Sequence, residues 1–109
     1  MSFFEKWEAI GNKDLDAMMK LMHPEWTMVI HSTGKIIDLI EYKETIGKVV
    51  VSGKLIRNDV RCIYENDEIM VSHAIVTFPN GVTDSLIYIG ILKDGKLFRT
   101  ETGLTPIKK

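Results

Sequence analysis

Two histidines, a tyrosine and an aspartate are the side chains of this sequence most suited to proton transfer. His31 and His73 carry imidazoles, whose ordinary pKa of about 6.5 lets them accept or donate a proton at neutral pH. A buried Tyr88 hydroxyl could donate a hydrogen bond to a developing enolate. Asp84 could orient a histidine across a sheet. These four residues form the candidate catalytic group.

Each member of this group also has a structural interpretation that the sequence leaves open. His31 could lie at a rim or on the surface with a satisfied hydrogen bond. His73 could lie on the outer face of a sheet or at a dimer interface. Tyr88 could be a core aromatic residue with a hydrogen-bonded hydroxyl, and Asp84 could be an acid at the solvated end of a strand.

A second group of side chains could line a cavity for a small apolar molecule. Methionine adapts to ligands of irregular shape, and aromatic rings offer large apolar surfaces. The candidates for substrate binding are Trp7, Met18, Met22, Trp26, Met28, Tyr42 and Phe78. We expect most of them to contribute to the core as well.

The sequence holds no recognisable pattern for a metal or a cofactor. Its histidines, at positions 23, 31 and 73, show no short ligand spacing. Neither an H-E-x-x-H motif nor a glycine-rich phosphate loop is present, and no G-x-S-x-G nucleophile elbow occurs. We therefore expect no metal and no cofactor.

Helices are predicted first along the chain. Apolar residues at helical spacing predict a helix that begins at Phe3, after a Ser2 cap, and ends at Gly11-Asn12. Asp14 is the expected N-cap of a second helix. Pro24 closes this helix, because the residue before a proline avoids the helical region.

Strands dominate the rest of the chain. Trp26–His31 is rich in β-branched and aromatic residues and predicts a first strand. Asp38 is the expected cap of a third helix that runs to about Val51. Tight turns then separate four predicted strands, which form an antiparallel meander: Ile56–Glu65, Ile69–Phe78, Thr83–Leu92 and Leu97–Thr102.

This order of elements, α-α-β-α-β-β-β-β, predicts an α+β fold in one domain that spans residues 1–109. Helices that precede a run of strands are expected to cover one face of the sheet. The predicted fold is therefore a cone, a curved antiparallel sheet packed against three N-terminal helices. Its interior or mouth is where a pocket would lie.

Composition narrows the class of protein further. The 109 residues are 45% hydrophobic and carry a formal charge of −1, which argues against nucleic acid or a membrane surface as a partner. Cys62 is the one cysteine, which excludes an internal disulfide and favours a reducing compartment. No apolar stretch reaches the roughly 20 residues of a transmembrane helix. We expect a cytoplasmic protein.

Four short motifs carry a resemblance to a known family. They are Asn-Lys-Asp-Leu-Asp-Ala at 12–17, Leu-Met-His-Pro-Glu at 21–25, His-Ser-Thr-Gly at 31–34 and Asp-Gly-Lys-Leu at 94–97. In this order they resemble the nuclear transport factor 2-like superfamily, which has a cystatin-like cone fold. The closest resemblance is to its SnoaL-like polyketide cyclase and ketosteroid isomerase branch.

The resemblance implies positions for catalytic groups. Isomerase-like members keep an acidic base near the end of the first strand. A gapless alignment places this base at Ile30, so a one-residue bulge is needed to bring His31 there. Relatives of the scytalone dehydratase type use sheet histidines, which would suit His73. Tyr88 falls where isomerase-like members keep an acid that stabilises an oxyanion, allowing one residue of difference in a turn.

The function implied by the resemblance is that of a small-molecule pocket protein. It would bind a small apolar or cyclic substrate and carry out a cofactor-free proton transfer, as in isomerisation, cyclisation or dehydration. The alternatives are a non-catalytic ligand-binding domain and a dimeric interaction domain. The resemblance also implies a homodimer formed by the outer sheet face, where Ile87, Ile89 and Ile91 alternate with Tyr88.

Overall fold

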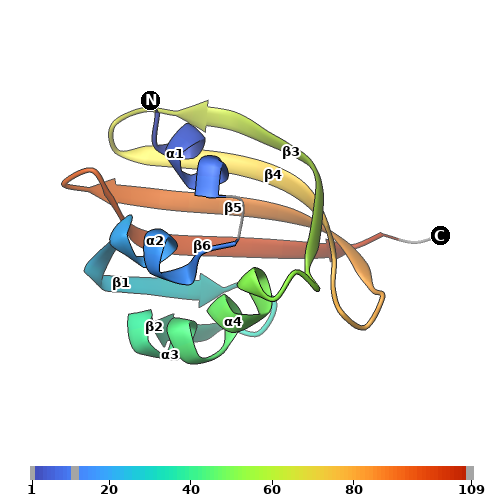
Figure 1. The fold of residues 1–109 in the computed structure, drawn as a ribbon. Helices are drawn as coiled ribbons and strands as arrows, with labels where there is room; N and C mark the ends of the chain where they lie inside the picture. The colour runs from blue at the N-terminus through green and yellow to red at the C-terminus, as the bar shows by residue number, and fades with distance from the viewer. Residues whose placement is uncertain (1, 11–12, 108–109) are drawn as a thin grey trace.

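The computed structural model describes residues 2–10 and 13–107 of the chain. Its helices are α1 (Phe3–Ile10), α2 (Leu15–Lys20), α3 (Leu39–Glu44) and α4 (Ile46–Val51). Its strands are β1 (Met22–Ile30), β2 (Lys35–Asp38), β3 (Ile56–Glu65), β4 (Ile69–Thr77), β5 (Thr83–Lys93) and β6 (Lys96–Pro106). The helices lie on one side of the sheet, with α1 near β3 and β4 and with α3 and α4 near β1 and β2 (Figure 1). The predicted α+β cone is therefore confirmed.

The sheet has the strand order β2-β1-β6-β5-β4-β3. The meander of β3, β4, β5 and β6 is antiparallel, as predicted. The sheet as a whole is mixed, however, because β1 runs parallel to β6. This pairing joins the N-terminal half of the chain to its last strand and places the helices over the concave face of the meander.

The predicted helix starts agree with the cap geometry. The Ser2 hydroxyl accepts a hydrogen bond from the Glu5 amide at 3.1 Å. Asp14 and Asp38 cap α2 and α3, accepting from the amides of Ala17 and Glu41 at 3.1 and 2.9 Å. Each cap satisfies an amide that has no partner inside its helix. The predicted end of the first helix at Gly11-Asn12 lies outside the described residues.

The predicted third helix is divided in two at Thr45. The Thr45 hydroxyl donates to the Glu41 carbonyl at 2.6 Å, and its backbone leaves the helical region with φ −122° and ψ −92°. Hydroxyl bonding to the preceding turn is known to bend helices. Two residues later, Gly47 packs so closely against α2 that a Cβ at this position would lie 2.8 Å from Leu15 Cδ1. The break thus lets α4 approach α2.

The first strand begins earlier than predicted and contains Pro24. The pairing of β1 with β6 shifts register between Met22 and Thr27. Pro24 lies within this irregular stretch, where its lack of an amide hydrogen breaks no regular ladder. The short strand β2, which pairs antiparallel with β1, was not predicted. Its four residues are too few to show a strand pattern, because they lie directly between a turn and a helix cap.

Two bulges set the directions of side chains on the edge strand β3. The register with β4 shifts between Asn58 and Arg61 and again between Cys62 and Tyr64. Asp59 lies in the first bulge with φ +54°, a region that aspartate tolerates better than most residues. The bulges break the simple alternation expected of this strand, so Arg57 and Val60 both lie on the concave side.

The buried core lies between the helices and the concave face. Its members include Phe3 and Trp7 of α1, Met18 of α2, Tyr42 of α3 and Trp26 of β1. The rings of Phe3 and Trp7 stack with centroids 5.9 Å apart, and those of Trp26 and Tyr42 meet edge to face at 5.0 Å. Aromatic residues from two helices and one strand thus hold the layers together.

Gly90 of β5 marks a close approach within this core. A Cβ at Gly90 would lie 2.7 Å from Leu97 Cδ1, and Leu97 is fully buried. By contrast, a Cβ at Gly103 of β6 would meet no atom within 4 Å. The two strand glycines therefore form a matched pair for testing the packing.

We predict that Gly90→Ala lowers the free energy of unfolding by about 1–3 kcal/mol, because overpacking displaces a fully buried side chain. Gly103→Ala should leave the free energy of unfolding unchanged or raise it slightly. Urea denaturation followed by tryptophan fluorescence measures both variants. Equal effects of the two substitutions would contradict the packing described at Gly90.

Candidate ligand-binding cavity

A cavity of about 510 Å³ lies between the concave face of the sheet and the helices. This volume is within the range of roughly 300–1,000 Å³ found for small-molecule sites. All the side chains proposed from the sequence to bind substrate line it: Trp7, Met18, Met22, Trp26, Met28, Tyr42 and Phe78. Most of the remaining wall is aliphatic, with side chains from α4, β3, β4, β5 and β6.

An ion pair forms one charged part of the cavity wall. Arg57 of β3 donates from Nη2 to Glu8 Oε1 at 2.8 Å and from Nη1 to Glu8 Oε2 at 3.2 Å. Both side chains line the cavity and are only partly exposed, Arg57 to 20% and Glu8 to 25%. A two-point pairing of this kind fixes the guanidinium plane as well as its charge. The pair also joins α1 to the edge strand.

Tyr42 provides a hydrogen-bond donor to the cavity. Burial raises the pKa of its hydroxyl to about 12, against a smaller opposing effect of the Arg57 charge. The hydroxyl therefore stays protonated at neutral pH. No hydrogen bond with a described residue is among the causes of its pKa shift, so its proton can be donated to an acceptor on a ligand.

Tyr88 lies in the cavity wall, and its hydroxyl is hydrogen-bonded to a residue of the neighbouring strand β6. The hydroxyl is 3.0 Å from Thr100 Oγ1, and the same oxygen accepts a hydrogen bond from Trp26 Nε1 at 2.9 Å. Burial raises the pKa of Tyr88, while the hydrogen bond with Thr100 lowers it by less. Of the four candidate catalytic residues, Tyr88 is the one that lines the cavity.

His31 lies on the other face of the sheet. Ile30 lines the cavity, and side chains of successive residues in a strand point to opposite faces. The register of β1 with β6 is regular from Thr27 to Ile30, so no bulge there turns His31 inward. Its Nε2 instead lies 2.9 Å from Glu101 Oε1, and this hydrogen bond is the main cause that lowers the pKa of Glu101.

His73 also lies on the outer face. Its β4 neighbours Ser72 and Ala74 line the cavity, which places His73 on the opposite side of the sheet. Its Nε2 is 2.7 Å from Ser85 Oγ, and its Nδ1 accepts a longer hydrogen bond from Arg61 Nε at 3.5 Å. The structure therefore brings neither His73 nor His31 to the cavity.

Asp84 is buried on the face of the sheet opposite His73. It pairs in register with Val76 of β4 and Pro106 of β6, on the concave face and beyond the cavity lining. Its Oδ1 is enclosed without a hydrogen-bond partner among the described residues. Because His73 lies on the outer face, Asp84 cannot orient it. The structure thus does not assemble the four residues into one site.

Sequence reasoning missed the charged pair of the cavity. Glu8 and Arg57 are 49 positions apart, so no local spacing connects them. Strict alternation along β3 would place Arg57 opposite Val60, whereas the bulge at Asp59 brings both to the cavity. The sequence could not predict this ion pair, because the bulge at Asp59 is not evident from the residues alone.

Within the described residues, no cluster of three or more histidine, cysteine or acidic side chains could hold a metal ion. No helix among them is long and apolar enough to cross a membrane. The cavity lining itself consists of an apolar wall, one ion pair and the hydroxyls of tyrosine, serine and threonine.

Comparison with known proteins defines the fold but not the function. No protein-family model matches the sequence, and no curated protein matches it either. Among solved structures, a nuclear transport factor 2-like protein of unknown function from Mesorhizobium loti superposes with a TM-score of 0.78 at 9% identity, over 94% of this chain and 88% of that one. The protein thus has the nuclear transport factor 2-like fold, as the sequence motifs indicated.

Two further matches come from the branch that the motifs resemble. A putative polyketide cyclase from Sinorhizobium meliloti matches with a TM-score of 0.69 at 16% identity, over 93% of each chain. A putative ketosteroid isomerase from Kribbella flavida matches with a TM-score of 0.70 at 11% identity, over 99% of this chain and 76% of that one. Identities this low establish a shared fold and leave the activity to the residues of the cavity.

The raised pKa of Tyr42 predicts how stability depends on pH. The unfolded tyrosine ionises at about pH 10, whereas folding holds Tyr42 protonated to about pH 12. Its stabilising contribution is therefore complete below pH 10 and is lost as the pH rises toward 12. Between about pH 9 and pH 11 we expect the free energy of unfolding to fall by about 1 kcal/mol on account of Tyr42.

Urea denaturation of the wild type and of Tyr42→Phe at both pH values measures this contribution. The variant should lose less stability than the wild type over the same interval, since phenylalanine does not ionise. Equal losses in the two proteins would show that Tyr42 ionises as freely in the folded state as in the unfolded chain.

Proposed function

We propose that the protein binds a small, mainly apolar molecule in this cavity, with an oxygen atom of the ligand accepting a hydrogen bond from Tyr42. The single observation that carries the proposal is an apolar cavity of about 510 Å³ whose lining includes Tyr42, with a hydroxyl that is protonated at neutral pH. An apolar wall with a few placed polar groups is the usual composition of such sites. The cyclase and isomerase of the same fold support a small, cyclic molecule as the ligand.

The arrangement favours binding over catalysis by histidine. Proton transfer needs a base within hydrogen-bonding reach of the ligand, and both His31 and His73 lie outside the cavity lining. Glu8 is the one carboxylate among the lining residues, and both of its oxygens accept from Arg57. Both oxygens of this carboxylate are thus already engaged by the guanidinium.

We predict saturable binding of N-phenyl-1-naphthylamine, an uncharged fluorophore whose emission rises in apolar surroundings. Fluorescence titration should give one site per chain with micromolar affinity. Ser72→Leu, which extends an apolar side chain into the cavity, should weaken binding at least about tenfold through steric exclusion. Thr105→Leu, at an exposed position of β6, is the control and should bind as the wild type does. Dye binding that Ser72→Leu leaves intact would refute binding in this cavity.

We propose, secondly, that two copies of the chain pair through their outer sheet faces. Val71, Ile75, Ile87 and Ile89 lie on this face, opposite the cavity, and Ile87 remains 38% exposed. Helices cover the concave face of the sheet, and apolar residues on both faces are typical of sheets covered on both sides.

We also propose a cytoplasmic location for the protein. The free, exposed cysteine Cys62 supports it, because a reducing compartment keeps thiols unpaired.

We predict that Ile87→Glu converts a dimer into a monomer, because it introduces one charge from each copy at the centre of the paired faces. Sedimentation velocity at micromolar concentration measures the mass. Ile40→Glu, at a position 70% exposed on α3, is the matched control and should sediment as the wild type does. A monomeric wild type under these conditions would remove the second proposal.

A further inference from the structure

A second, smaller cavity of about 300 Å³ adjoins the first. Both cavities share Val50, Leu55, Arg57 and Val60 as lining residues, and the smaller one adds Val51, Gly53 and one charged residue, Lys13. Arg57 therefore lies at the boundary between the two spaces. We call the smaller space the vestibule.

The linings of the two spaces carry one net positive charge. Their ionised side chains are one carboxylate, Glu8, and two bases, Arg57 and Lys13. Glu8 offsets the charge of Arg57 through their two-point pairing. Lys13 forms no ion pair with any described residue. The uncompensated charge thus belongs to Lys13, on the vestibule side.

We propose that the ligand is an apolar carboxylic acid bound as its anion. Its mainly hydrocarbon body fills the main cavity, where an oxygen substituent accepts the hydrogen bond from Tyr42, and its carboxylate lies in the vestibule near Lys13 and Arg57. This inference rests on the proposed function and gives the ligand a charge and an orientation. A carboxylate at neutral pH carries a single negative charge, which matches the net charge of the linings. A phosphate monoester carries about −1.5 to −2 and would exceed it.

The position of Arg57 supports this orientation. Glu8 fixes the guanidinium at the boundary, so a carboxylate in the vestibule approaches a cation that needs no rearrangement. The apolar side chains of Val50, Leu55 and Val60 line both spaces, so a hydrocarbon chain would meet apolar surface on either side of the boundary. Attraction between charges is stronger beside such low-dielectric walls than in water.

The test compares two ligands that differ only in their head group. Decanoate and decan-1-ol are each titrated against bound N-phenyl-1-naphthylamine, and displacement gives their apparent affinities. In a neutral cavity, the uncharged alcohol should bind more tightly, because the carboxylate loses its hydration. We expect the reverse order in the wild-type protein, with decanoate displacing the dye at the lower concentration.

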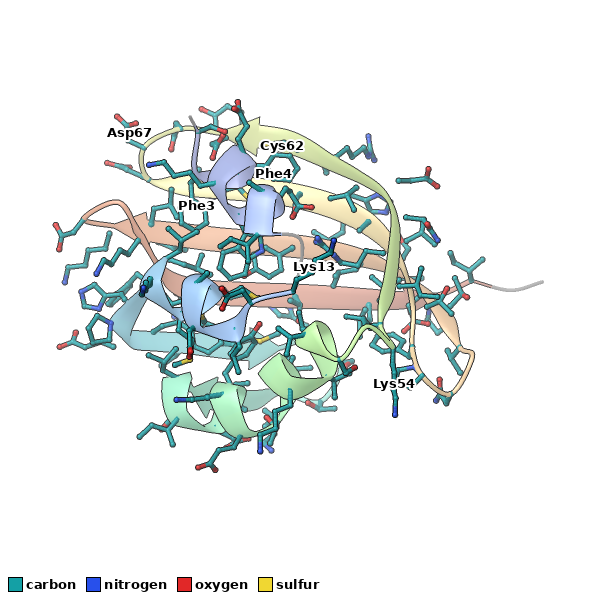
Figure 2. The ribbon with its side chains drawn as sticks, in the orientation of Figure 1. Phe3, Phe4, Lys13, Lys54, Cys62 and Asp67 are labelled. Carbon is teal, nitrogen blue, oxygen red and sulfur yellow. The ribbon has the colours of Figure 1, made fainter. Side chains whose placement is uncertain are left out.

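Lys13→Gln and Lys54→Gln provide the matched variants. Lys54 lies in the loop after α4, outside both linings, and extends away from the body of the protein, whereas Lys13 lies between α1 and α2 (Figure 2). Lys13→Gln should weaken decanoate binding about five- to tenfold and leave decan-1-ol unchanged. Lys54→Gln should alter neither. Added salt should weaken decanoate binding alone, since it screens charge.

Three results would overturn the inference, and they are distinguishable. If decan-1-ol displaces the dye more readily than decanoate does, the cavity takes uncharged ligands and the proposed function stands. If Lys13→Gln affects both ligands alike or neither, the vestibule does not hold the carboxylate. If the dye itself fails to bind the wild type, the inference fails together with the proposed function.

Discussion

Trp26 and Tyr88 form part of the cavity wall, and the hydroxyl of Thr100 holds both of them in place. It is completely buried and lies within hydrogen-bonding distance of both Trp26 Nε1 and the Tyr88 hydroxyl. A buried donor or acceptor that loses its partner costs about 1–3 kcal/mol. One threonine on β6 therefore satisfies polar atoms of β1 and β5 at once. Because Thr100 satisfies the indole nitrogen of Trp26 and the hydroxyl of Tyr88, both rings can face the cavity and neither has a polar atom without a partner.

The parallel pairing of β1 with β6 makes this arrangement available. It brings Trp26 next to Thr100 although 74 positions separate them. Trp26 then packs edge to face against Tyr42 of α3, and Tyr42 carries the hydroxyl that a ligand would meet. A chain of contacts thus runs from the centre of the sheet to a helix. The apolar burial that stabilises the fold and the placement of the hydrogen-bond donor arise from the same contacts.

The sequence predicted the types of the elements and the residues of the apolar wall better than it predicted the faces of the strands. Helix caps and tight turns are local signals, so the starts at Ser2, Asp14 and Asp38 were readable from spacing. The large apolar residues of the first half had only one core to occupy. On β4, however, apolar residues lie on both faces: Met70, Ala74 and Val76 inward, Val71 and Ile75 outward. Alternation alone could not decide which face received His73.

The charged part of the site shows why the remainder could not be predicted. The edge strand β3 exposes one row of backbone groups, and bulges are a common device against unwanted pairing at such edges. In this chain the bulge at Asp59 also reverses the alternation, so that Arg57 and Val60 come to the same cavity. Arg57 can then hold Glu8 of α1, while Glu65 of the same strand accepts from the Phe4 amide at 2.8 Å. Two contacts with β3 thus fasten α1 over the cavity. The irregularity that protects the sheet edge also gives the cavity its charge, and it is a property of strand pairing that no local pattern of residues records.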